Sequence, residues 1–158
     1  MITVIGVDPG LAGTGIGLVT GSGMKVDRYS FGSIATKSTA SLSQRLALIY
    51  SKIVDVLNDQ KPELMVIEDV FSLDRYPKSG ILLGKVSGTV LLAAAHYGIP
   101  AVEIPVRESK KILSGNGNAG KEQLENAVRR FLNHTAPIRP YHSSDALALA
   151  LIGLFRHS

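Results

Sequence analysis

The sequence contains no cysteine, which excludes both a disulfide framework and a thiolate metal site. No basic segment precedes the first apolar run, and no apolar stretch approaches the roughly 20 residues that a helix needs to span a bilayer. We find neither an internal repeat nor an interdomain linker. These absences predict a cytoplasmic protein without a membrane segment, in which residues 1–158 form a single domain with a sizeable core.

Charge is distributed unevenly along a chain whose net charge is +4. Residues 1–74 carry six Lys/Arg and eight Asp/Glu. Residues 75–130 carry nine Lys/Arg and four Asp/Glu, and residues 131–158 carry two Lys/Arg and one Asp/Glu. A basic middle beside an acidic first half suits a polyanion held against a carboxylate site. Ordinary scatter of charge over a solvated surface explains the same counts, so charge alone does not decide for nucleic acid.

The first 20 residues carry the most informative pattern. An apolar run over residues 2–7 ends in Asp8, and Pro9 and Gly10 follow at once. A strand buried on both faces reads as a continuous apolar run, so Asp8 is expected where a central strand stops. Pro9 would end the hydrogen-bonding ladder, and Gly10 would let the backbone come close to whatever the carboxylate serves. Because Asp also favours turns, an ordinary strand-ending turn is the alternative.

The segments up to residue 69 predict a mixed sheet. Strands over residues 13–20 and 24–36, joined by a turn at Gly21-Ser22-Gly23, extend the first strand into an antiparallel meander. A helix that begins after Ser41 and ends at Lys61-Pro62 has apolar residues three or four positions apart, and a strand over residues 63–69 follows it. Since a strand–helix–strand crossover is right-handed, this fourth strand should run parallel to the first.

The second half of the chain is predicted to add helices and one strand. After a polar loop over residues 70–78, a helix over residues 79–97 is apolar on most faces and ends at Gly98, so it is either deeply buried or half of a dimer interface. A short strand over residues 101–104, helices over 106–113 and 121–132, and a last helix that starts near Asp145, capped by Ser143 or Ser144, complete the chain. The expected fold class is α/β.

Three carboxylates and a histidine are expected at one edge of this sheet. Asp8 and Glu68 end two strands that should be parallel and adjacent, and open sheets place their sites beyond the carboxyl ends of such strands. Glu68 follows an apolar run, where burying a carboxylate is costly unless a cation or hydrogen bonds compensate. Asp69 alternates to the other face. Asp145 is also explained as a first-turn acid and His142 as a surface histidine, but together the four side chains form a candidate site for divalent metal.

Five motifs in a fixed order point to a known family: Ile5-Gly6-Val7-Asp8-Pro9-Gly10, Arg45-Leu46-x-x-Ile49-Tyr50, Ile67-Glu68-x-Val70-Phe71, Lys110 followed by Gly115-x-Gly117-x-Ala119-x-Lys121-x-Gln123, and Asp145-Ala146-Leu147-Ala148-x-Ala150. With these motifs the chain resembles the RuvC family of Holliday junction resolvases, in the ribonuclease H-like superfamily. The resemblance covers nearly the whole chain. It implies a ribonuclease H-like mixed five-stranded sheet, with three antiparallel strands followed by two parallel ones and helices on both faces.

The resemblance also implies a catalytic metal site. Asp8, Glu68 and Asp145 match the acids that hold two divalent ions per subunit, and His142 stands where many members have a fourth acid and some have histidine. Two Mg²⁺ ions would support in-line phosphodiester hydrolysis that leaves 5′-phosphate nicks. Because imidazole suits manganese better than magnesium, His142 predicts that Mn²⁺ substitutes well.

Residues expected to contact DNA fall into two groups. Lys110 and Lys121 match family lysines near the scissile phosphate and are predicted to be catalytic, and Phe71 matches an aromatic that inserts beside bases at the crossover, with core packing as its alternative. The remaining candidates are basic residues suited to phosphate contact by their charge: Arg75, Lys78, Lys111, Arg129 and Arg130. One departure from the family pattern is Gly84-Lys85-Val86-Ser87-Gly88, in place of the more common Gly-Gln-Ala-x-Gly, which puts DNA contacts and sequence preference in question.

The resemblance implies a homodimeric endonuclease that nicks four-way junction DNA symmetrically in recombination and repair, alongside RuvA and RuvB. Three alternative functions would explain parts of the same sequence. A junction-binding module that has lost catalysis would explain His142 but not the retained acids and lysines. An actin-like ATPase or sugar kinase lobe opens with a similar hairpin but needs a second lobe. A resolvase of the YqgF type is closer in chemistry, but the segment from Lys110 to Gln123 favours RuvC.

Overall fold

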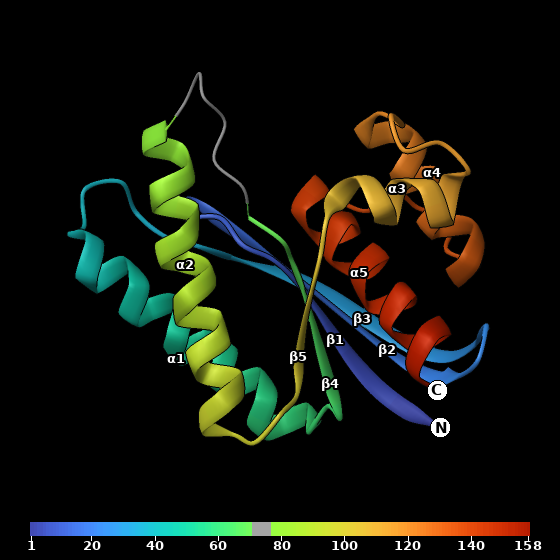
Figure 1. Ribbon diagram of the computed structural model, residues 1–158, viewed down its shortest axis with the longest axis horizontal. Helices are drawn as coiled ribbons and strands as arrows, with labels where there is room; N and C mark the ends of the chain where they lie inside the picture. The colour runs from blue at the N-terminus through green and yellow to red at the C-terminus, as the bar shows by residue number, and fades with distance from the viewer. Residues whose placement is uncertain (71–76) are drawn as a thin grey trace.

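The computed structural model describes residues 1–70 and 77–158. Within these residues, five strands form one mixed sheet in the order β3-β2-β1-β4-β5 (Figure 1). The first three strands are antiparallel: β1 (Ile2–Asp8), β2 (Gly13–Ser22) and β3 (Lys25–Ala35). β4 (Leu64–Glu68) runs parallel to β1, and β5 (Ala101–Ile104) runs parallel to β4. The predicted mixed sheet, including a fourth strand that runs parallel to the first, is confirmed.

Helices cover both faces of the sheet, as expected (Figure 1). One face carries α1 (Leu42–Gln60) and α2 (Pro77–His96), and the other carries α3 (Val106–Ser114), α4 (Lys121–Leu132) and α5 (Tyr141–His157). Successive side chains of a strand point to opposite faces. Ile5 and Ile67 therefore join the core beneath α1 and α2, whereas Val4 and Val66 join the core beneath α5.

The start of α1 follows its sequence signal. Ser41 is the N-cap in an extended conformation, its hydroxyl accepts from the backbone N–H of Gln44, and the Gln44 side chain accepts from the Ser41 backbone N–H. This capping box satisfies two backbone donors that a helix start otherwise leaves unpaired. Lys61, in the left-handed conformation, ends the helix where the sequence indicated.

The turn between β2 and β3 lies closer to β3 than predicted. Ser22 pairs with Lys25, so the turn consists of Gly23 and Met24, and Gly21 is still part of β2 at an irregularity in the register. A two-residue hairpin turn needs a positive φ, which glycine adopts without strain. Gly23 provides it with φ +57°, and β2 therefore extends to Ser22, two residues into the expected turn.

The helix α2 begins at Pro77 rather than at residue 79, because proline is well suited to the first helical position. The predicted loop therefore ends two residues too late. Only one side of α2 is covered: Val86 and Val90 are buried, whereas Ile81 is 60% exposed and Leu92 is 51% exposed. The helix is not deeply buried. By length and composition alone it is also the one helix of the described residues that could span a bilayer, a possibility that the sequence-based expectation overlooked, although core helices of globular proteins meet the same criteria.

The last helix begins at Tyr141, four residues before the predicted start near Asp145. Pro140 is its N-cap, and the predicted serine caps are wrong because both hydroxyls have other acceptors. Ser143 Oγ donates to the backbone carbonyl of Gly32 on β3, and Ser144 Oγ donates to that of Tyr141, each at 2.9 Å. Asp145 thus lies in the second turn of α5 and is not a capping or first-turn acid.

Three glycines allow α5 to lie directly against the backbone of β1 and β2. Gly6 and Gly17 are cross-strand partners on these strands, and Gly15 lies one pair further along the same face. A Cβ at Gly6 would be 1.9 Å from the carbonyl oxygen of Ala146, and a Cβ at Gly15 would be 1.9 Å from that of His142. Since the Cβ positions are occupied by helix backbone, any side chain there would push α5 away from the sheet.

Candidate active site

The carboxyl groups of Asp8 and Glu68 lie at the carboxyl ends of β1 and β4. The parallel register pairs Val7 with Ile67, so the next two residues along these strands are Asp8 and Glu68. Both continue the alternate positions that face α5. Asp8 is 6% exposed and Glu68 is partly buried, so the two acids meet in a poorly solvated place at the edge of the sheet.

The first turns of α5 bring two further ionisable groups to this edge. Nδ1 of His142 lies 2.9 Å from Oδ2 of Asp8. The imidazole lies beside the start of β2, where a Cβ at Gly13 would be in ordinary van der Waals contact with it, 3.5 Å from Cδ2. Asp145 follows three residues later, close enough for its charge to act on Glu68 and for the charge of Asp8 to act on it. The structure therefore brings together the four side chains that the sequence singled out.

The electrostatics of this cluster are those of crowded carboxylates. Burial, followed by a hydrogen bond to Asp8 and the negative charges of Asp8 and Asp145, raises the pKa of Glu68 to about 9, although Lys110 acts in the opposite direction. Burial, followed by the charge of Asp8, raises the pKa of Asp145 to about 6. Both shifts express the cost of holding several negative charges together away from water, a cost that a bound cation would relieve.

Positive groups stand around the carboxylates. The hydrogen bond to Asp8 is the main cause that raises the pKa of His142, and the charges of Asp8 and Asp145 add to it, against burial and the charge of Lys121. Lys110, on α3, lies close enough for its charge to act on both Glu68 and Asp145. The α3 and α4 lysines predicted from the sequence are therefore close to the acids in space as well.

Whether these residues could hold a metal ion depends on their donor atoms. In the described part of the chain, no three His, Asp or Glu side chains are arranged to hold an ion as they stand, and Asp8 Oδ2 is engaged by His142. The chemistry of the set nevertheless fits a divalent cation. Carboxylate oxygens are the ligands that Mg²⁺ and Mn²⁺ prefer, and imidazole is a ligand for manganese. The raised pKa values of Glu68 and Asp145 indicate an excess of negative charge at this point.

The predicted DNA contacts differ in how open they are. Lys78, Lys111, Lys121 and Arg130 are exposed, and Arg130 borders an open polar cavity of about 920 Å³ beside α3 and α4. The predicted contacts Phe71 and Arg75 lie outside the described residues.

Arg129, by contrast, is engaged within the fold. Its Nε lies 2.9 Å from Oε1 of Glu125, and its other nitrogens donate to the carbonyl of Thr135 and the side chain of Asn126. It differs in this respect from the open phosphate contact that the sequence suggested.

Comparison with known proteins places the chain in a family. A sequence profile described as "Crossover junction endodeoxyribonuclease RuvC" matches residues 4–153. The chain belongs to the RuvC family. Proteins of that name from Prosthecochloris aestuarii and Carboxydothermus hydrogenoformans are 36% and 35% identical over 151 and 153 residues. The first alignment covers 96% of this chain and 80% of the relative, and the second covers 97% and 96%.

Solved structures agree with this assignment. The RuvC of T. thermophilus in complex with a Holliday junction substrate matches with a TM-score of 0.90 and 31% identity, over 98% of this chain and 94% of that one. The yeast mitochondrial Holliday junction resolvase matches with a TM-score of 0.59 at 12% identity, which shows a common fold alone. The ribonuclease H-like fold implied by the five motifs is thus confirmed, and the chain is a member of a nuclease family.

Two features of the site region escaped the sequence analysis. The glycines that seat α5 were read only as part of a strand, although the alternation Gly13-x-Gly15-x-Gly17 marks one strand face without side chains. The buried acid Glu125 was not singled out either, because its i, i+4 spacing to Arg129 is common on exposed helices. Its burial to 1% exposure is a property of the tertiary structure.

Proposed function

We propose that this RuvC family member resolves Holliday junctions by symmetric, metal-dependent cleavage of two strands. The observation that carries the proposal is the convergence of Asp8, Glu68 and Asp145 on one poorly solvated edge of the sheet, flanked by Lys110 and Lys121. The relatives named crossover junction endodeoxyribonuclease, and the Thermus RuvC bound to its Holliday junction substrate, support the substrate class.

In the proposed mechanism Asp8, Glu68 and Asp145, together with His142, would hold two divalent ions, Mg²⁺ or Mn²⁺. When bound, such a pair of ions stabilises the attacking water and the departing oxygen of an in-line phosphodiester hydrolysis, which leaves a 5′-phosphate. Glu68, whose pKa is raised to about 9 by burial and its acidic neighbours, would have to be deprotonated to serve as a ligand. His142 must release Oδ2 of Asp8 for that oxygen to serve as a ligand.

The two lysines act on the phosphate itself. The charge of Lys110 acts to lower the pKa values of Glu68 and Asp145, and the charge of Lys121 acts to lower the pKa of Asp145. Both ammonium groups are therefore close to the acids, where the scissile phosphate would enter. As compact point charges they hold a phosphate and offset the negative charge that develops during hydrolysis.

A two-fold dimer suits this reaction, because two symmetric strands require two sites in a fixed relation. The exposed apolar side of α2, with Ile81, Leu82 and Leu92, is the surface we assign to the dimer contact. In this proposal the dimer acts on chromosomal junctions in the bacterial cytoplasm together with RuvA and RuvB.

Cleavage of a mobile synthetic four-way junction tests the proposal. Native protein should produce paired, symmetric nicks with Mg²⁺ or Mn²⁺, and Glu68→Gln should bind the junction without cutting it. Cleavage by Glu68→Gln at the native rate would refute the metal site, and nicks scattered on linear duplex at equal rates would refute junction specificity.

The hydrogen bond between His142 and Asp8 favours a second candidate, a junction-binding module without catalysis. In that case Asp8 would be permanently engaged by the imidazole and no cation would be held. Tight junction binding without nicks under either ion would establish this alternative. Cleavage by the native protein would exclude it.

A further inference from the structure

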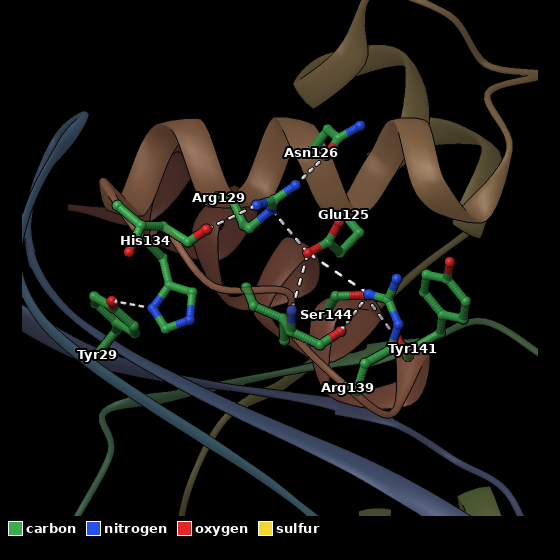
Figure 2. Close-up of polar contacts among 10 residues, drawn as sticks. Tyr29, Glu125, Asn126, Arg129, His134, Arg139, Tyr141 and Ser144 are labelled. Carbon is green, nitrogen blue, oxygen red and sulfur yellow. Dashed lines mark hydrogen bonds and ion pairs between the residues drawn. The ribbon is translucent and has the colours of Figure 1, made fainter.

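Arg139 is an arginine outside the predicted site that the fold holds in one place while leaving it half exposed. Its side chain is 48% exposed. Its guanidinium carbon lies 4.1 Å from the centroid of the Tyr141 ring, Nη1 donates to the carbonyl of Ile138 at 3.0 Å, and the same nitrogen lies 3.7 Å from Oε1 of Glu125 (Figure 2). Ordering an arginine side chain costs on the order of 2 kcal/mol of rotamer entropy. The three contacts of Arg139 offset this cost and fix the orientation of its guanidinium.

The buried partner of Arg139 is Glu125, on α4. Its carboxylate accepts from the backbone N–H of Ile138 at 2.9 Å and forms its closest ion pair with Arg129, at 2.9 Å. A carboxylate that is 1% exposed needs a cation and hydrogen bonds, and Arg129 with the Ile138 N–H already provides both. Neutralising Glu125 therefore does not explain why Arg139 lies there as well.

The two arginines differ in the donors that remain. Arg129 uses Nη1 and Nη2 for Thr135 and Asn126 and turns Nε toward Glu125. Among the described residues, Nε and Nη2 of Arg139 have no hydrogen-bond acceptor, and only Nη1 is engaged. Arg139 is thus an oriented guanidinium with one side of its fork open, the geometry that suits a phosphate oxygen pair.

The position of Arg139 relates it to the catalytic edge. The ring of Tyr141 that it covers also lies 5.9 Å from Nζ of Lys121, so both cations lie within 6 Å of one ring. Lys121 acts on the charges of His142 and Asp145, and Tyr141 is the first residue of the helix that carries both. Through this ring the guanidinium of Arg139 adjoins the ammonium group of Lys121, where the proposed scissile phosphate would lie.

We propose that Arg139 binds a backbone phosphate of the junction strand next to the catalytic carboxylates, with Glu125 and Tyr141 as positioning residues that orient its guanidinium. The inference rests on the proposed function for its substrate class, a nucleic acid backbone. It adds a phosphate contact on the segment between α4 and α5, outside the motifs that the chain shares with the RuvC family.

The test is equilibrium binding of a labelled four-way junction in EDTA at several salt concentrations, with native protein and Arg139→Ala. We expect Arg139→Ala to bind about fivefold to twentyfold more weakly at low salt and to lower the slope of log K against log salt by about one, because one phosphate contact is lost. Lys25→Gln is the matched control. It removes one positive charge from the β2–β3 hairpin, where Lys25 forms an ion pair with Asp27, and should bind as native protein does.

Junction binding by two Tyr141 variants tests whether the ring orients Arg139 or only stabilises the fold. Tyr141→Phe keeps the ring beneath Arg139 and should bind as native protein does, whereas Tyr141→Leu should show a smaller form of the Arg139→Ala defect with its melting temperature within a few degrees of native. Equal binding by the Leu and Phe variants would overturn the role of the ring.

An unchanged salt slope in a folded Arg139→Ala variant, or the same loss in Lys25→Gln, would overturn the phosphate contact even if native protein cleaves junctions. Because this assay needs no metal and no cleavage, the proposed function can fail on nicking while the slope comparison still decides the role of Arg139. Native protein that does not bind the junction at all would overturn both.

Discussion

Nδ1 of His142 lies 2.9 Å from Oδ2 of Asp8, although 134 positions separate these residues in the sequence. The contact joins the first turn of α5 to the end of β1 and gives the strand-ending acid a partner that can be neutral or positive. The contact shows that the candidate site is built from both ends of the chain, with one residue on the first strand and one on the last helix. It also makes His142 the residue whose replacement is most informative about the metal.

Replacing His142 with Asp should shift metal preference toward magnesium. An imidazole suits manganese better, whereas a carboxylate is a hard oxygen ligand that suits both ions. We expect the ratio of cleavage rates with Mg²⁺ to those with Mn²⁺ to rise about tenfold or more in His142→Asp relative to native protein. Single-turnover cleavage of one junction with each ion measures this ratio, and an unchanged ratio would show that His142 is not a ligand.

Replacing Glu68 with Gln should stabilise the metal-free protein at neutral and higher pH. Burial, a hydrogen bond to Asp8 and nearby acids raise the pKa of Glu68 in the folded state to about 9, from its ordinary value of 4.5. The favourable contribution of the protonated carboxyl is fully present below pH 4.5 and is lost as the pH rises toward 9. We expect a gain of about 1–2 kcal/mol, or ~2–8 °C in melting temperature, at pH 8 in EDTA.

The same gain should shrink toward pH 4.5 and should be absent in Asp69→Asn, which changes the acid directly after the end of β4. Added Mg²⁺ should raise the melting temperature of native protein but not of Glu68→Gln, since only the native site gains by binding a cation. A gain from Glu68→Gln that is independent of pH would contradict the electrostatic account.

Substituting Gly15 with Ala should destabilise the fold and impair the site together. The new Cβ would lie 1.9 Å from the carbonyl oxygen of His142, so α5 must move away from β2. We expect a loss of about 2–4 kcal/mol in urea unfolding, in line with other severe steric changes in cores. Gly32→Ala, on the neighbouring strand with nothing within 4 Å of its Cβ, is the control and should cost less than about 1 kcal/mol. Equal losses in both variants would show that the seating of α5 is not the cause.

A charge on the exposed side of α2 should disrupt the proposed dimer. Leu92 is 51% exposed on that side, and burying a carboxylate at an apolar contact is strongly unfavourable. Leu92→Glu should be monomeric by light scattering at concentrations where native protein is dimeric, and it should cut one strand of a junction without coupling to the second. Met24→Glu, at a still more exposed apolar residue of the β2–β3 turn, should remain dimeric. A Leu92→Glu variant with native mass would exclude this surface as the contact.

Local signals account for the parts of the fold that sequence reasoning recovered. The apolar run before Asp8, the Ser41 capping box and the pattern of residues 121–132 each depend on neighbours in sequence, and each element appears close to where it was expected. The misplaced start of α5 arose where a distant contact overrode a local preference. Ser143 is a good N-cap residue, but its hydroxyl donates to Gly32, 111 positions away, and the helix begins two residues earlier, at Tyr141.

The sequence by itself determined the order of elements, the parallel crossover, the family and the identity of the acids, because spacing and alternation are written along the chain. Only the tertiary structure decided that Asp145 lies inside α5 and not at its start, that glycine backbones seat this helix, and that Arg129 is engaged while Arg139 is open. These features depend on the distances between backbones of packed elements and on which of two arginines lies closer to the buried carboxylate of Glu125. Such choices are made in space, between residues that no local pattern connects.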